Sequence, residues 1–328
     1  MNCPGPTIVR AFFVASNFPF MSLSPPPPSA LAERLNALAP HVGSTPLLRL
    51  RRLEPHAGVA VYAKAEWQQL GGSIKSRAAF SILQSAAAQL GGRRVLDATS
   101  GNTGIAYATF CAAAGIPLTL CMPENASPER KRILEWLGAE LVFTSPFEAT
   151  EGSQDAARDL VRRHPDRYAY LDQYSNDANW QAHVQTTAPE VWDQTQGRIT
   201  HFIAGLGTTG TFTGTTRGLK ARNADVRCIA LQPETALHGL EGWKHLETAR
   251  VPGIFDAGLP DATRNVSTDD AYAMMRRAAR EEGLLLSPSA AANLAGAVAL
   301  ATELESGVVV TVFADDASKY HDTLSRLA

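Results

Sequence analysis

A lysine stands in a short glycine- and serine-rich turn, where it could act as a nucleophile. The turn, residues 71–77, lies between an expected strand at 61–65 and an expected helix at 78–90. Lys75 would then sit at a helix start, where the positive end of the helix dipole and any burial lower the pKa of an amine. A neutral amine can attack a carbonyl group and form a covalent adduct. Taken alone, the same residues also fit an exposed lysine in an ordinary turn.

A second turn, residues 98–104 (ATSGNTG), joins an expected strand at 95–98 to an expected helix at 103–114. Its hydroxyls and free backbone N–H groups could hold a carboxylate, while the amide of Asn102 bonds a ring substituent. The alternative is a helix cap with a tight turn, since serine, threonine, asparagine and glycine all favour that position. The sequence of this turn alone leaves both interpretations open.

A third turn, residues 205–211 (GLGTTGT), follows an apolar strand and opens a helix. Glycines let the backbone approach a ligand closely, threonine hydroxyls add donors, and the helix dipole favours an anion. The pattern also fits the GxGxxG fingerprint of dinucleotide-binding proteins. However, the acid expected about 20 residues further on is missing apart from Asp225, which lies in a polar stretch. The threonines therefore favour a monophosphate.

Composition excludes several other classes. With 328 residues, 45% of them hydrophobic, and a formal net charge of −2, the chain is typical of a soluble enzyme and lacks the basic stripe of nucleic-acid-binding proteins. No apolar run approaches the roughly 20 residues that span a bilayer. The histidines are spread out and no metal-binding motif appears, so we expect no metal. The cysteines lack CxxC spacing and fit free thiols in the cytoplasm: Cys3, Cys111, Cys121 and Cys228.

The three turns need a scaffold of alternating strands and helices. Such an alternation begins at Val59 and recurs in the second half of the chain, which predicts βαβ units around parallel sheets. Ligands of such sheets bind beyond the carboxyl ends of the strands, where these turns would lie. The expected strands are 59–64, 95–98, 118–122, 199–204, 227–232 and 308–313, and the expected helices are 78–90, 103–114, 128–137, 210–221, 269–282 and 290–303.

The order of lysine turn, asparagine turn and threonine-rich turn resembles fold-type II pyridoxal-phosphate (PLP) enzymes. The resemblance runs over residues 42–320 and is closest to the cysteine synthase and cystathionine β-synthase family, in particular its cysteine synthase B group. It implies a fold like that of the tryptophan synthase β subunit, with two three-layer α/β domains and mostly parallel sheets. The segments that carry it are VGSTPLLRL, GGSIKSRAA, ATSGNTGIAYA, MPENASPERKRILEWLGAEL, the stretch from Leu171 to Thr211, LQPE and VPGIF.

The resemblance also implies a domain organisation and an assembly. Residues 68–178 would form a smaller mobile domain, and residues 41–67 with 179–328 the larger PLP-binding domain. Residues 1–40, which contain the prolines 25–28, would be a partly disordered tail; translation could also begin at Met21. The protein would be a cytoplasmic homodimer with no membrane or nucleic-acid partner.

Site residues are implied position by position. Lys75 would form the Schiff base with PLP, and Asn102 would bond the ring hydroxyl of the cofactor. Ser289 would face the pyridine nitrogen. The phosphate would be held by Gly207, Thr208, Thr209, Gly210 and Thr211. The substrate carboxylate would be bound by Thr99, Ser100, Thr103 and Gln173.

The implied reaction is β-replacement. O-acetyl-L-serine or O-phospho-L-serine would lose its β-substituent to give an aminoacrylate intermediate, which adds sulfide or thiosulfate and yields L-cysteine. The alternatives are formation of cystathionine or 2,3-diaminopropionate, or a catalytically weak regulatory paralogue. The third is suggested by departures from the family pattern at Ser76, at 287–292 and at 314–320. The segment 238–245 is either a surface loop or a place where Lys244 or His245 meets an anionic leaving group.

Overall fold

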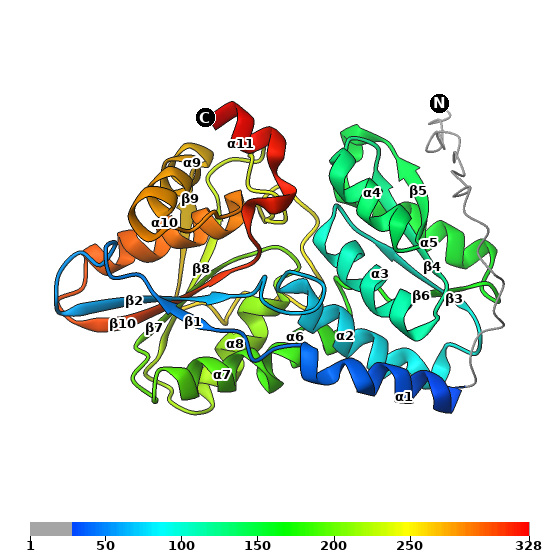
Figure 1. Ribbon diagram of the computed structural model, residues 1–328, viewed down its shortest axis with the longest axis horizontal. Coiled ribbons are helices and arrows are strands. Elements are labelled where there is room, and N and C mark those ends of the chain that lie inside the picture. The colour runs from blue at the N-terminus through cyan, green and yellow to red at the C-terminus, as the bar shows by residue number, and fades with distance from the viewer. Residues whose placement is uncertain (1–27, 328) are drawn as a thin grey trace. The chain divides into compact units, whose positions relative to one another are not determined.

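The computed structural model describes residues 28–327, and the chain divides into two compact units. Within the described residues, the first unit comprises 28–38 and Leu83–Asp172, and the second comprises Ala39–Ile82 and 173–327. Most of the expected disordered tail lies outside the described residues. Its end is helical, because α1 spans Pro28–Leu38 and the short helix η1 spans Ala39–His41 (Figure 1).

The first unit contains a four-stranded parallel sheet with the order β5-β4-β3-β6. Every residue of β4 is buried, as is typical of a parallel strand covered on both faces. Around the sheet lie helices that start at local signals; for example, the Ser127 side chain caps α4 by accepting a hydrogen bond from the N–H of Arg130. The strands are β3 (Arg94–Ala98), β4 (Leu118–Pro123), β5 (Glu140–Thr144) and β6 (Tyr168–Tyr170), and the helices are α3 (Asn102–Ala114), α4 (Pro128–Trp136), η3 (Pro146–Glu148) and α5 (Ala149–Arg163).

The second unit contains a six-stranded sheet with the order β1-β2-β10-β7-β8-β9, in which the edge strand β1 runs antiparallel and the others run parallel. The strands are β1 (Leu47–Arg49), β2 (Val59–Ala65), β7 (His201–Gly205), β8 (Arg227–Pro233), β9 (Ala262–Val266) and β10 (Gly307–Phe313). The helices are α6 (Asp177–Gln185), α7 (Thr187–Gln194), α8 (Gly210–Lys220), α9 (Thr268–Arg277), η4 (Ala278–Glu282), α10 (Pro288–Thr302), η5 (Ala317–Lys319) and α11 (His321–Leu327). The boundary between the units falls inside α2 (Lys75–Ala86), which η2 (Ala87–Gln89) follows.

Helices cover both faces of the second sheet, so this unit has three layers (Figure 1). On one face, α9 and α10 contribute Met274, Leu294 and Leu300 to a core with residues of β2, β8 and β10. On the other face, Phe212 of α8 and Val191 of α7 pack into a second core. The expected α/β architecture with mostly parallel sheets is confirmed.

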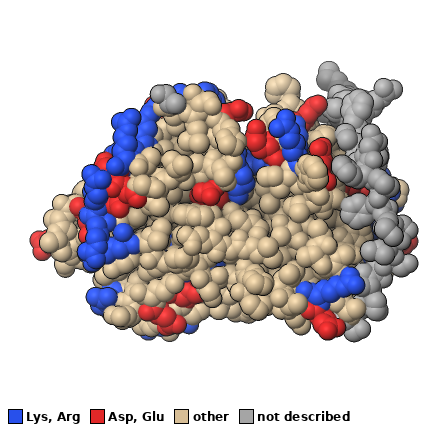
Figure 2. All heavy atoms as spheres, in the orientation of Figure 1, with Lys and Arg blue, Asp and Glu red and all other residues tan. Residues whose placement is uncertain are grey.

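Every segment expected from the sequence corresponds to an observed strand or helix, with ends that differ by a few residues. The helix expected from residue 78 already begins at Lys75, and α9 gives way to the π-helical turn η4 before residue 282. Among residues 28–327, no helix is long and apolar enough to cross a membrane, and no His/Cys/Asp/Glu cluster could hold a metal ion. On the face drawn in Figure 2, basic and acidic side chains lie beside one another.

Candidate active site

Lys75 is the first residue of α2, and the turn before it is fixed to the end of the second sheet. The N–H of Ile74 donates a hydrogen bond to the carbonyl of Ala314, just after β10, at 2.8 Å. Gly72 has φ of +62°, a left-handed conformation that glycine adopts without strain. Lys319 Nζ donates to the carbonyl of this glycine at 3.0 Å. The nucleophile expected from the sequence therefore sits at a helix start, on a turn held by β10 and the residues that follow it.

The charge of Lys75 is set by burial and by one carboxylate. Burial lowers the pKa of the Lys75 amine below its ordinary value, and the attraction of Asp315 opposes this shift. Asp315 is fully buried and accepts a hydrogen bond from the Tyr320 hydroxyl at 3.0 Å, while Lys319 Nζ lies 3.6 Å from the same oxygen. The lowered pKa of Lys75 favours the neutral form of its amine, which is the nucleophilic form. Asp315 belongs to the segment 314–320 that departs from the family pattern, and no local sequence pattern places it near Lys75.

The threonine-rich loop after β7 lies beside this amine. A Cβ added at Gly207 would stand 2.1 Å from the carbonyl oxygen of Gly242 and 4.0 Å from Lys75 Nζ. Only glycine fits there, because the first contact is with backbone. Thr209 has φ of +71°, which is unusual for a residue with a side chain and marks the sharp bend into α8. The structure therefore brings Lys75 together with the loop that was expected to hold a phosphate.

The residues around Lys75 fit pyridoxal phosphate. The hydroxyl oxygens of Ser73, Ser76 and Thr209 are buried and have no hydrogen-bond partner within the described part of the chain. A buried hydroxyl without a hydrogen-bond partner destabilises the fold unless a ligand or another group supplies the missing bond. An anion at the start of α8 would meet backbone N–H groups and the positive end of the helix dipole. A phosphate on the loop and a carbonyl carbon at Lys75 would satisfy both the geometry and the chemistry of this donor set.

A second loop covers the threonine-rich one. The N–H of Lys244 donates to the carbonyl of Leu206 at 2.7 Å, and a Cβ at Gly205 would lie 1.9 Å from the ring of Trp243. The Lys244 side chain is only 7% exposed, with Nζ 5.4 Å from the ring centroid of Tyr174. The surface-loop interpretation is therefore wrong for Lys244.

Ser289 lies in the first turn of α10. The hydroxyl of Ser287 caps this helix by accepting from the N–H of Ala290 at 3.2 Å, and it lies 3.3 Å from the Ser289 hydroxyl. Asn293 ties the helix to the sheet, accepting from the N–H of Gly205 and donating to the carbonyl of Val312, both at 2.8 Å. The alanines of the segment that departs from the family pattern, residues 290–292, lie in regular helix, a conformation that alanine favours.

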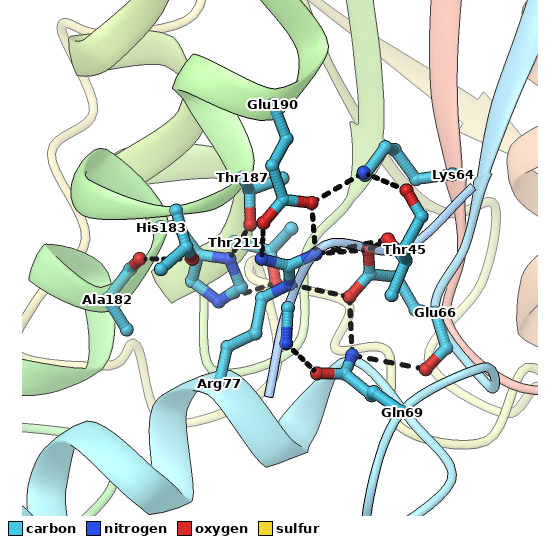
Figure 3. A network of polar contacts seen from close by, with 12 residues as sticks. Thr45, Lys64, Glu66, Gln69, Arg77, Ala182, His183, Thr187, Glu190 and Thr211 are labelled. Atoms are coloured by element: carbon cyan, nitrogen blue, oxygen red, sulfur yellow. Dashed lines mark hydrogen bonds and ion pairs between the residues drawn. The ribbon is translucent and has the colours of Figure 1, made fainter. Parts of the chain in front are cut away.

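A network of buried and half-buried charged side chains surrounds Arg77, which stands two residues after Lys75 (Figure 3). Arg77 binds Glu66 through Nε at 2.7 Å and Glu190 through Nη1 at 2.6 Å. Lys64 Nζ binds the other oxygen of Glu190 at 2.6 Å, and the hydroxyl of Thr45 donates to Glu66 at 2.6 Å. Burial opposes ionisation of Glu190, but Arg77 and Lys64 lower its pKa to about 2. The members of this network are far apart in the chain, so no local sequence pattern predicts it.

The asparagine turn belongs to the first unit and connects β3 to α3. The hydroxyl of Thr99 accepts from the N–H groups of Gly101 and Gly104, at 3.0 and 3.1 Å. Asn102, expected to bond the ring hydroxyl of the cofactor, is the first residue of α3 and shares this turn with three of the expected carboxylate-binding residues, Thr99, Ser100 and Thr103. Gln173 lies in the second unit and is buried.

Comparison with known proteins identifies the family. The family described as "Pyridoxal-phosphate dependent enzyme" matches residues 38–315, and the chain belongs to it. The protein is a PLP-dependent enzyme of fold-type II. It is 46% identical over 292 residues to a cysteine synthase of Aquifex aeolicus, covering 86% of this chain and 89% of that one. It is 37% identical over 294 residues to cysteine synthase B of Escherichia coli, covering 88% and 95%. A solved O-acetylserine-dependent cystathionine β-synthase from Helicobacter pylori is 28% identical with a TM-score of 0.81, covering 87% and 96%.

Proposed function

We propose that the protein is a cysteine synthase that makes L-cysteine from O-acetyl-L-serine or O-phospho-L-serine and sulfide or thiosulfate. The observation that carries the proposal is the position of the Lys75 amine, which has a lowered pKa and lies beside Gly207 in the threonine-rich loop. Similarity to the Aquifex and Escherichia coli cysteine synthases supports this reaction among those of PLP-dependent enzymes.

Each part of the site has a proposed role. Lys75 holds the cofactor, removes the Cα proton of the bound amino acid and later returns it. PLP, when bound, supplies the conjugated system that stabilises negative charge at Cα. Asn102 bonds the ring hydroxyl of the cofactor. The phosphate is held by Gly207, Thr208, Thr209, Gly210 and Thr211, and the substrate carboxylate is bound by Thr99, Ser100, Thr103 and Gln173.

Ser289 is proposed to favour β-replacement over transamination. Its neutral hydroxyl, facing the pyridine nitrogen, would not keep that nitrogen protonated as a carboxylate would. Negative charge at Cα is then less widely delocalised, which favours prompt loss of the β-substituent. The cap by Ser287 and the anchor through Asn293 hold the first turn of α10, and with it Ser289, in place.

The proposal is tested by supplying donor and acceptor to the purified protein. O-acetylserine with sulfide should yield cysteine, and the Lys75→Ala variant should lose at least about a thousandfold in rate, because both covalent attachment and proton transfer depend on the amine. Arg93→Ala is the control and should keep the wild-type rate, because Arg93 is a half-buried residue of the first unit whose side chain bonds the nearby carbonyls of Gln89 and Leu90. Absence of cysteine with every donor and sulfur acceptor would refute the assignment.

The second candidate is β-replacement with a different acceptor, which the structural similarity to the cystathionine β-synthase of Helicobacter pylori favours. An acceptor panel of sulfide, thiosulfate, homocysteine and ammonia separates the candidates. Turnover that is highest with homocysteine would identify cystathionine formation, and highest with ammonia would identify 2,3-diaminopropionate formation. Binding of PLP without turnover of any acceptor would identify a regulatory paralogue.

We further propose that Lys244 favours donors with an anionic leaving group. Its burial next to the threonine-rich loop places a positive charge close to Leu206 and Tyr174. Lys244→Gln should lower kcat/KM for O-phosphoserine about tenfold or more while changing that for O-acetylserine by less than about threefold. Lys220→Gln, which removes a partly exposed lysine paired with Asp261, is the control. Equal losses with both donors would contradict this role.

Three further proposals concern the whole protein. It forms a homodimer, it is located in the cytoplasm, and a smaller domain at residues 68–178 closes when substrate binds. Closure would exclude water from the reacting centre. Light scattering of the purified protein tests the dimer. Limited proteolysis with and without substrate tests closure, since a domain that closes should become more resistant when substrate is bound.

A further inference from the structure

Helix α6 packs unusually close to the first turns of α8. A Cβ at Gly210 would lie 1.9 Å from Asn179 Oδ1, and one at Gly214 would lie 2.0 Å from the carbonyl oxygen of Trp180 and 2.7 Å from His183 Cβ. These two glycines, four residues apart, face two α6 side chains that are also four residues apart. The close packing puts Asn179 and His183 directly behind the threonine-rich loop.

The Asn179 amide is buried and its orientation is fixed. Its Nδ2 donates to the carbonyl of Gln173 at 2.7 Å and to the hydroxyl oxygen of Thr208 at 3.2 Å. A backbone carbonyl can only accept hydrogen bonds, so the amide nitrogen, not the oxygen, must face Gln173. The Oδ1 atom then points at Gly210 and has no hydrogen-bond partner within residues 28–327. Leaving this oxygen unsatisfied is costly, which indicates that the residue is retained for the bonds of its nitrogen.

The bond from Asn179 determines what the Thr208 hydroxyl can do. Because its oxygen accepts a hydrogen from Nδ2, the hydroxyl hydrogen must point away from Asn179. Thr208 is only 6% exposed and lies between Gly207 and Thr209 in the loop. The Thr208 hydroxyl can therefore donate its hydrogen only in a direction away from Asn179. In this loop, such a donor would face the position expected for the anion.

We propose that Asn179 is a positioning residue that turns the Thr208 hydroxyl toward the cofactor phosphate and ties this hydroxyl to the main chain of Gln173. The inference rests on the proposed function, in which residues 207–211 hold the phosphate. One side chain then couples the loop that binds the phosphate to a residue proposed to bind the substrate carboxylate.

The neighbouring His183 cannot fix the direction of a hydrogen bond in the same way. His183 Nε2 lies 3.3 Å from the Thr211 hydroxyl and Nδ1 lies 2.9 Å from the Thr187 hydroxyl. Burial and the charges of Arg77 and Lys75 lower the pKa of His183, which is therefore neutral. A neutral imidazole donates from one nitrogen and accepts at the other, so it can bond Thr211 in either sense. Asn179, whose nitrogen can only donate, fixes the direction at Thr208.

A double-mutant cycle on cofactor binding tests the proposal. The variants are Asn179→Ala, Thr208→Val, which removes the hydroxyl but keeps the shape, and the double variant. Cofactor is removed with hydroxylamine, and the dissociation constant of added PLP is measured by absorbance. Each single variant should weaken binding about tenfold or more, since a hydrogen bond to a charged group is lost or misdirected. The double variant should be no weaker than the weaker single variant, because Asn179 acts through the hydroxyl.

Two outcomes would overturn the inference: effects of the two substitutions that multiply, or a Thr208→Val variant that binds PLP as tightly as the wild type. Thr208→Ser, which keeps the hydroxyl, is the control and should bind within about threefold of the wild type. Asn179→Ser provides a second variant should the alanine form fail to fold, as judged by thermal unfolding without cofactor. The ³¹P resonance of bound PLP should shift in both single variants and not shift further in the double one. Failure of the wild type itself to bind PLP would instead refute the proposed function.

Discussion

Arg77 and Glu66 form a two-point ion pair inside the second unit, with Nε–Oε2 at 2.7 Å, Nη2–Oε1 at 2.9 Å and neither side chain exposed. Arg77 also bonds both carboxylate oxygens of Glu190, at 2.6 and 2.8 Å (Figure 3). Because Arg77 stands two residues after Lys75, this network anchors the first turn of the helix that presents the nucleophile. We therefore expect a structural role for these charges.

Replacing Arg77 by methionine should lower the free energy of unfolding by about 3 to 5 kcal/mol, because the fully buried carboxylate of Glu66 and the half-buried one of Glu190 lose their shared partner. Urea unfolding followed by circular dichroism measures the change. Arg264→Met is the matched control, since Arg264 forms a two-point pair with the exposed Glu303 and should cost less than about 1 kcal/mol. Similar losses in the two variants would contradict a structural role for the buried network.

Glu190 makes stability depend on pH in the acid range. Its pKa is lowered from 4.5 to about 2 in the folded protein, so the unfolded chain binds the proton more readily. The stabilisation is fully present above about pH 4.5 and is lost as the pH falls toward 2. Glu190→Gln should therefore be less stable than the wild type at neutral pH but lose less stability between pH 4.5 and 2. The exposed Glu305→Gln control should follow the wild type, and parallel curves for Glu190→Gln would refute the assignment.

Much of the fold and the nucleophile could be predicted from the sequence because their signals are local. Apolar runs such as Leu118–Pro123 and glycine-containing turns at their ends mark the parallel strands and the places where ligands bind. One turn marked Lys75 as a candidate nucleophile without deciding its role, and one run of glycines and threonines marked the loop that was expected to hold a phosphate. The reaction class, by contrast, depended on all three turns together.

The remainder of the site depends on contacts between distant parts of the chain. Asp315 reaches Lys75 because β10 ends beside the Lys75 turn, and Lys244 is buried because its backbone bonds Leu206. Helices α6 and α7 and the edge strand β9 were not predicted either. The sequence of β9, ATRNV, is mostly polar, and a proline stands inside α7, so neither segment carries a strong sequence pattern. Such features become visible only when the sheet order is known.

Gly207→Ala should weaken PLP binding at least about tenfold while leaving the fold intact. The added Cβ would lie 2.1 Å from the carbonyl oxygen of Gly242, so the threonine-rich loop must move away from Gly242. Absorbance titration with PLP measures the loss, and circular dichroism checks the fold. Gly258→Ala is the control, because its Cβ would meet only Asp256 Oδ1, at an ordinary 3.5 Å. Wild-type affinity in Gly207→Ala would show that the cofactor does not use this loop.

The central claim, that Lys75 holds the cofactor, is tested most directly by reducing the PLP-loaded protein with borohydride. This treatment fixes the cofactor on whichever lysine carries it, and peptide mass spectrometry then locates the label. The structure predicts one phosphopyridoxyl group per chain, on Lys75, and none in Lys75→Ala under the same conditions. A label on the neighbouring Lys319 or on the buried Lys64, or an unlabelled Lys75 in a protein that binds PLP, would contradict the account.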